Sequence, residues 1–232
     1  MDLTTTDWQL SETLREATGR ANRPDPALPR TGGPAGNARL TAWTGAVLLV
    51  LFAIEGITLL DVRGYIGWHV TVGALLVPPA LLKTVTTTWR IIRYYRGNDA
   101  YRTAGPPPLP LRILGPVVVL STLSVLGTGI LVVTLGPESG RNGLAGTPLS
   151  ALFLHQAAFA VWITATTLHV LGRAVPAFAI LTGRVGHRGV AGKVLRLAAL
   201  VLVAVAAAWL GHLLYDTLPA WQQEVRFHPD RG

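Results

Sequence analysis

The stretch LSALFLHQAAFAVWITATTLHVLG, residues 149–172, decides the fold, because it is long and apolar enough for a helix to cross a lipid bilayer. It carries His155 and His169, which are fourteen residues apart. In a helix, that spacing returns to nearly the same face about 21 Å further along, which places one histidine near each side of a membrane. Ionisable side chains are costly in hydrocarbon and usually face the protein interior. The two histidines therefore predict a buried functional stripe.

Four more apolar runs lie along the chain, and together they define the class of protein. Of the 232 residues, 50% are hydrophobic and 14% are charged, and the charges gather between the apolar runs. Five runs approach the length of about 20 residues that a membrane-spanning helix needs. They are residues 40–60, 65–82, 111–135, 149–172 and 194–214. The expected fold class is all-α, an integral membrane helical bundle with five transmembrane helices.

The segments outside these runs leave no room for a second folded domain. Because of their Pro, Gly and Thr content, we expect residues 1–39 to form a disordered cytoplasmic tail. Residues 40–216 form the expected membrane domain, and residues 217–232 a C-terminal tail. The chain has no cysteine, which excludes disulfides, iron–sulfur clusters, thiolate metal sites and covalent attachment of a c-type haem.

The net charge of +8 indicates membrane topology rather than a nucleic-acid partner. Basic residues crowd the N-terminal tail, the loop between the second and third runs, and the loop between the fourth and fifth runs. The other two loops hold only Arg63 and Arg141. By the positive-inside rule, this alternation predicts a multi-pass protein of the cell membrane with a cytoplasmic N-terminus and an external C-terminus.

This topology places several polar residues at one depth. At about 1.5 Å per residue from the outer helix ends, His69 lies about 5 Å and His155 about 9 Å below the outer boundary. Glu55 and His212 fall within the same outer third. Four polar groups from four helices at one depth indicate a shared site rather than lipid-facing accidents.

A haem is the cofactor that two such histidines favour, and their neighbours suit a flat macrocycle. Gly73 lies one turn from His69, and Phe159 lies one turn from His155. Glycine leaves space for a ring edge, and aromatic side chains supply flat apolar walls. Ordinary membrane packing explains Gly73 and Phe159 equally well, so the prediction depends on the histidines.

The pair of His155 and His169, and His69 followed fourteen residues later by Lys83, resemble the bundle of membrane b-type cytochromes. In that bundle, two helices each offer ligands at this spacing to two stacked haems. The strings FAIEGITLL (52–60), LLK (81–83), RIIRYY (90–95) and HVL (169–171) look like an actinobacterial group of small cytochrome b-like membrane proteins. The resemblance spans roughly residues 40–175.

The resemblance implies a cytochrome b-like four-helix core, haem b as the cofactor, and His69, His155 and His169 as metal ligands. It also implies an external oxidoreductase partner, since members of that group are often associated with molybdopterin-dependent, sulfite-oxidase-like enzymes. The sequence departs from the two-haem pattern at Lys83, where a fourth histidine is expected. A complete outer haem is therefore expected, and a second, inner haem is left open.

Lys83 and Glu55 each have several open roles. Lys83 could snorkel to the interface, neutralise a haem propionate, or ligate iron. Glu55 could accept the ring N–H of His69, carry a proton to a quinol site, or complete a local hydrogen-bond network. His212 could bond a propionate, although a histidine near a helix end is more often interfacial.

These observations predict a membrane b-type cytochrome that transfers electrons between the quinone pool and an oxidoreductase partner outside the membrane. Helices one to four would enclose the haem, and the fifth would pack peripherally among membrane lipids. Two alternatives remain open. One is a non-haem metalloenzyme in which His69, His155, His212 and Glu55 bind the metal, and the other is a haem-free anchor or assembly subunit.

Overall fold

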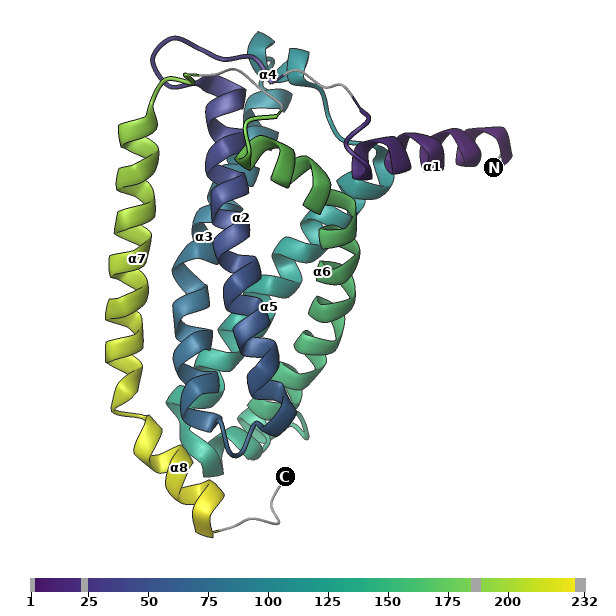
Figure 1. Ribbon diagram of the computed structural model, residues 1–232. Helices are drawn as coiled ribbons and strands as arrows, with labels where there is room; N and C mark the ends of the chain where they lie inside the picture. The colour runs from purple at the N-terminus through teal and green to yellow at the C-terminus, as the bar shows by residue number, and fades with distance from the viewer. Residues whose placement is uncertain (1–2, 22–24, 185–188, 228–232) are drawn as a thin grey trace. The chain divides into compact units, whose positions relative to one another are not determined.

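The computed structural model describes residues 3–21, 25–184 and 189–227 (Figure 1). Five of its helices are long and apolar enough to cross a membrane. They are α2 (Gly33–Thr58), which η1 (Leu59–Asp61) extends, α3 (Ile66–Tyr95), α5 (Leu109–Arg141), α6 (Ala151–Leu181) and α7 (Lys193–Tyr215). Each matches one predicted apolar run, and no strand occurs within the described residues. The all-α fold class and the five spans are therefore confirmed.

The helices extend beyond the apolar runs, because polar and basic residues at the run ends stay helical. α3 continues to Tyr95, well past the predicted end at residue 82. α5 turns at Gly136, whose φ of 80° belongs to the left-handed region, directly after the predicted run ends at residue 135. The apolar window of α3 is 39% buried, and that of α7 is 11% buried. α7 is therefore the least buried of the five spans.

The N-terminal segment contains a helix that we did not expect. α1 occupies Leu3–Ala17, and α2 already begins at Gly33, although the sequence predicts a disordered tail over residues 1–39. α1 docks through Glu16, whose Oε1 lies 2.6 Å from Nη1 of Arg173 on α6. Short helices are marginal in isolation, so tertiary contacts of this kind account for the difference.

The C-terminal segment also contains a helix within the predicted tail. α8 occupies Leu218–Phe227. It docks through Trp221, which packs with Val132 and Ala151 in a buried cluster, and through Glu224, which pairs with Arg141 at 2.8 Å. Between the long helices α3 and α5, a short helix α4 spans Asp99–Ala104.

The chain divides into two compact units, and each is described by itself. Unit 1 consists of Met1–Ala46, Leu82–Val119 and Ile163–Leu200. Its interior is comparatively polar, because Asn37 Nδ2 donates to the carbonyl of Thr86 at 3.1 Å and Thr41 Oγ1 donates to Thr86 Oγ1 at 3.0 Å. These bonds join α2 to the second half of α3.

Unit 2 consists of Val47–Leu81, Leu120–Trp162 and Val201–Gly232. A buried apolar cluster joins α2 and α3 in this unit. Its members are Leu48, Leu76 and Ala80, with Leu51, Phe52 and Leu126 packed against them. Between helices in a membrane, contacts of this kind stabilise mainly through van der Waals packing. The cluster therefore holds α3, which carries His69, against α2 and α5.

Candidate functional site

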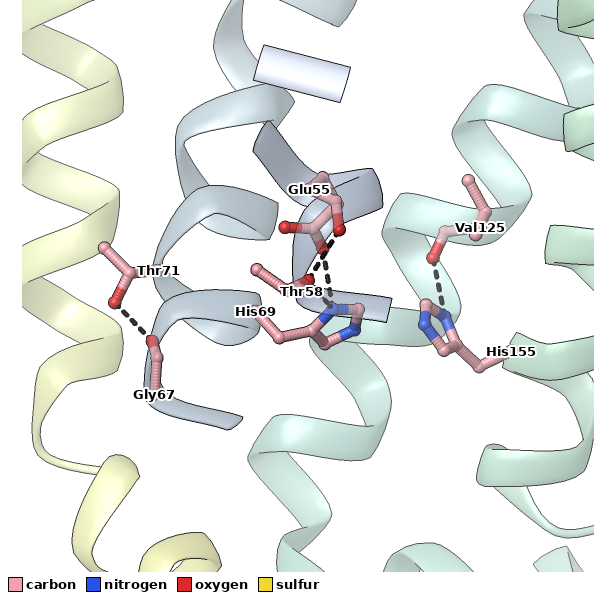
Figure 2. A network of polar contacts seen from close by, with 7 residues as sticks. All are labelled: Glu55, Thr58, Gly67, His69, Thr71, Val125 and His155. Carbon is pink, nitrogen blue, oxygen red and sulfur yellow. Dashed lines mark hydrogen bonds and ion pairs between the residues drawn. The ribbon is translucent and has the colours of Figure 1, made fainter. Parts of the chain in front are cut away.

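His69 of α3 and His155 of α6 lie together in unit 2. Their ring centroids are 6.3 Å apart, and the ring planes meet at 78°. Figure 2 shows the two rings close together, with His69 extending from α3 and His155 from α6. The prediction that the two histidines share a depth agrees with this arrangement.

His69 is held by two oxygen atoms at one ring nitrogen. Its Nδ1 lies 3.0 Å from Glu55 Oε1 and 3.0 Å from Thr58 Oγ1 (Figure 2). The Thr58 hydroxyl donates its own proton to the carbonyl of Glu55 at 2.6 Å, so its oxygen is left to accept from His69. Both partners therefore favour the tautomer in which Nδ1 of His69 carries the proton.

His155 is held in the same way by a different kind of partner. Its Nδ1 lies 3.0 Å from the carbonyl oxygen of Val125 on α5 (Figure 2). A carbonyl can only accept, so Nδ1 of His155 is the donor. Thr128 Oγ1 lies 3.3 Å from the same nitrogen, and its proton is donated to the carbonyl of Ser124 at 2.6 Å.

These contacts decide which nitrogen of each ring is available to a metal. Metal-binding histidines almost always donate their second ring N–H to a carboxylate, a carbonyl or water. The contacts described for His69 and His155 all engage Nδ1, which leaves the lone pair of Nε2 as the ligand atom in both rings. Two imidazoles on opposite sides of one metal ion, with bonds of about 2 Å, have ring centres about 6 Å apart. The observed separation of 6.3 Å fits that arrangement.

A glycine on α5 gives His155 access to the backbone. In a helix, each side chain covers the turn before its own Cα, so residue 129 would cover the carbonyl of residue 125. Gly129 has no side chain, and a Cβ there would lie 3.1 Å from Cε1 of His155. We did not predict Gly129 from the sequence. Gly73, which we did predict, instead faces Glu55, whose Oε1 would lie 3.7 Å from an added Cβ.

Aromatic side chains from α2 and α6 pack together in unit 2. The ring centroids of Phe52 and Trp162 are 4.6 Å apart, and those of Phe159 and Trp162 are 5.9 Å apart. Trp162 is buried, and its indole N–H donates to Thr122 Oγ1 at 3.1 Å. The cluster gives unit 2 a rigid apolar wall on the helix that carries His155.

The other two predicted ligand positions, Lys83 and His169, both belong to unit 1. The Lys83 ammonium donates to the carbonyl of Thr41 on α2 at 3.1 Å. Gly45 stands one turn after Thr41, and a Cβ there would lie 2.9 Å from Lys83 Nζ. His169 lies one turn before Arg173 on α6, and Arg173 pairs with Glu16 at 2.6 Å. Unit 1 thus combines one imidazole with two cations.

His212 and Glu55 differ sharply in their surroundings. His212 is exposed on α7. The Glu55 side chain is 16% exposed, and its Oε2 is a buried atom without a hydrogen-bond partner among the described residues. Across the described ranges 3–21, 25–184 and 189–227, no group of three or more His, Cys, Asp or Glu side chains is arranged to hold a metal ion.

Comparisons with known proteins add no relative: no family, no curated protein and no solved structure matches this chain. The fold and the composition of its spans define the chain as a multi-pass helical membrane protein.

Proposed function

We propose that this chain is a membrane b-type cytochrome, which holds one haem b between His69 and His155 and transfers single electrons. The observation that carries the proposal is the histidine pair itself. Two rings from different helices face each other at 6.3 Å, and both have Nδ1 occupied by hydrogen-bond partners.

The residues of unit 2 would each have a defined task around such a cofactor. His69 and His155 would ligate the iron through Nε2. Glu55 and Thr58 would orient His69, and the carbonyl of Val125 would orient His155. A bound haem would supply reversible one-electron chemistry at its iron, at a potential that depends on the ligands, their hydrogen bonds and burial.

The partners follow from the same proposal and from the resemblance described above. We propose the quinone pool and an external oxidoreductase of the molybdopterin-dependent type as the two electron-transfer partners. A second haem at His169 would need a further ligand, and the Lys83 ammonium is engaged with the carbonyl of Thr41. We therefore propose one haem per chain.

An optical spectrum of the purified, detergent-solubilised protein, before and after dithionite and with pyridine haemochrome quantitation, tests the proposal. His69→Ala and His155→Ala should each abolish the absorption bands of the reduced haem. His212→Ala is the matched control, because it removes an exposed histidine of the same unit and should leave the bands intact. Metal without porphyrin would favour the metalloenzyme, and neither metal nor haem would favour an anchor subunit.

The orientation in the membrane is a separate part of the proposal. The arginine distribution supports a cytoplasmic N-terminus and an external C-terminus. A reporter fused at Gly97, between α3 and α4, should then read as cytoplasmic, and one at Gly140, near the end of α5, should read as external. Both reporters on one side would contradict the five-span topology.

A further inference from the structure

Helix α1 belongs to unit 1, and it contacts α5 and α6 of that unit through its polar side. The Glu16 side chain is 11% exposed and pairs with Arg173 of α6 at 2.6 Å. Two turns earlier, Gln9 Oε1 accepts a hydrogen bond from the backbone N–H of Leu109, the first residue of α5, at 3.4 Å. In Figure 1, α1 lies beside the start of α5 and the end of α6, the two segments of unit 1 that it contacts. Amphipathic interfacial helices lie in the plane of a membrane, with one flank in the lipid.

The outward sides of α1 are not alike. Leu10 and Leu14 are four residues apart on one flank, and they are 53% and 64% exposed. Ser11 and Arg15 occupy the adjacent flank, about 100° around the helix, and are also exposed. The chain therefore buries a carboxylate and leaves two leucines uncovered, which is the reverse of the pattern expected for a surface helix in water.

The surface next to α1 indicates what covers the leucines. Immediately after α1, the backbone at Gly19 reaches Val175 of α6, whose Cγ1 would lie 3.2 Å from an added Cβ. On this part of α6, Leu171, Val175 and Phe178 are 68%, 50% and 56% exposed, as expected for side chains that face lipid. Leu10 and Leu14 of α1 and these three residues of α6 are thus exposed apolar side chains of the same compact unit.

We propose that α1 is an interfacial helix seated in the lipid leaflet. Leu10 and Leu14 insert at the boundary between headgroups and acyl chains, where burial of apolar side chains is favourable. Ser11 and Arg15 face the headgroups and water, and Glu16 ties the helix to α6 through Arg173. Trp8 is 59% exposed, and tryptophan is enriched at membrane–water interfaces, where its ring sits at the level of the headgroups. This proposal does not depend on haem binding.

The absence of cysteine from the chain makes a direct test possible, because each single cysteine carries one label. Spin labels at Leu10→Cys and Leu14→Cys are compared with labels at Ser11→Cys and Arg15→Cys on the same helix. The full chain is reconstituted in vesicles of phosphatidylcholine and phosphatidylglycerol. Collision rates are measured with oxygen, which concentrates in lipid, and with a water-soluble nickel complex.

We expect the labels at positions 10 and 14 to collide several-fold more with oxygen than with nickel, relative to those at positions 11 and 15. A label at Leu171→Cys gives the value for a lipid-facing site. Equal values at all four α1 positions would overturn the proposal, since the helix would then be in water. Exclusion of both reagents at positions 10 and 14 would also overturn it, because protein rather than lipid would cover the leucines.

Discussion

Unit 2 and unit 1 receive polar side chains from the same two helices, α3 and α6, at the same fourteen-residue spacing, yet their chemistry differs. In unit 2, His69 and His155 present two imidazole rings whose Nδ1 atoms are both engaged in hydrogen bonds or ion pairs. In unit 1, Lys83 is bonded to a backbone carbonyl, and Arg173 is paired with Glu16. Spacing along a helix therefore determines where polar groups lie, whereas the identity of the partner determines what they can bind.

The two units nevertheless share one structural device. Val125 is followed four residues later by Gly129, and Thr41 is followed four residues later by Gly45. In each case, the carbonyl that the glycine uncovers accepts a donor from another helix: His155 Nδ1 in unit 2 and Lys83 Nζ in unit 1. The acceptor in unit 1 is thus of the same kind as the one that orients a histidine in unit 2.

The largest effect is expected from making unit 1 resemble unit 2. Lys83→His would place an imidazole at each of the four positions of the fourteen-residue pattern on α3 and α6. We expect haem per protein to rise about twofold, measured as pyridine haemochrome, because a second pair of imidazole ligands is formed. Lys83→Gln, which supplies no ligand, should leave the haem content unchanged. If the wild-type protein holds two haems and Lys83→Gln keeps both low-spin, then a residue other than Lys83 completes the ligation in unit 1, and the proposal of one haem per chain is wrong.

A smaller effect is expected from blocking the uncovered carbonyl of unit 2. In Gly129→Ala, the methyl group would lie 3.1 Å from Cε1 of His155, so the ring must shift from Val125. Weakening that hydrogen bond costs about 1 kcal/mol, which corresponds to about fivefold weaker haem binding. Titration of the haem-free protein with haemin measures this change in haem affinity.

Gly127→Ala is the control, since no atom lies within 4 Å of its added Cβ and the residue is on the same helix. It should bind haem as the wild type does. Equal binding by the two variants would show that Gly129 does not serve His155.

The two ligands within unit 2 can be compared through their partners. Glu55→Gln replaces a charged acceptor of His69 by a neutral one, and removal of a negative charge favours the reduced iron. The midpoint potential should rise by about 40 mV, the equivalent of about 1 kcal/mol for one electron. Thr128→Val should change it less, because the carbonyl of Val125 still accepts from His155. A lower potential in Glu55→Gln would exclude the orienting role of the carboxylate.

The smallest effect concerns the edge of unit 1. Glu16→Gln removes the ion pair with Arg173, whose side chain is 39% exposed. The docking of α1 should therefore lose about 1 kcal/mol of stability. Hydrogen exchange of the α1 amides should then become about fivefold faster. Glu12→Gln breaks only the exposed pair with Arg15 and should cost about 0.3 kcal/mol. Similar exchange in the two variants would indicate that Glu16 does not hold α1 in place.

The spans were predictable from the sequence because hydropathy alone determines them. Five apolar runs became five long helices, and only their polar ends were underestimated, as in α3, which continues to Tyr95. α1 and α8 were missed, since their stability comes from docking contacts such as Glu16 with Arg173 and Trp221 with Val132. Contacts between distant segments leave no periodic signal in a sequence.

The candidate site was predictable in part for the same reason. Counting residues from the helix ends placed His69 and His155 at similar depth, and the structure brings their rings together. Glu55 was one candidate partner of His69, and it lies 3.0 Å from the ring. The other three partners could not be predicted by counting, because one is a main-chain carbonyl and two are threonine hydroxyls. Gly129 was the available signal: a glycine within a long apolar helix marks a place where another helix can reach the backbone.

The carbonyl of Val125 has a consequence for how such a site can change during evolution. Every amino acid carries a main-chain oxygen, so substitutions at position 125 leave the acceptor of His155 in place. The orientation of the His155 ring depends instead on the glycine at position 129, which keeps that oxygen accessible. His69 depends on the side chain of Glu55, which a single codon change can remove. Side-chain mutations can thus change the hydrogen bonding of His69 step by step. The hydrogen bond of His155 stays the same until Gly129 itself is replaced.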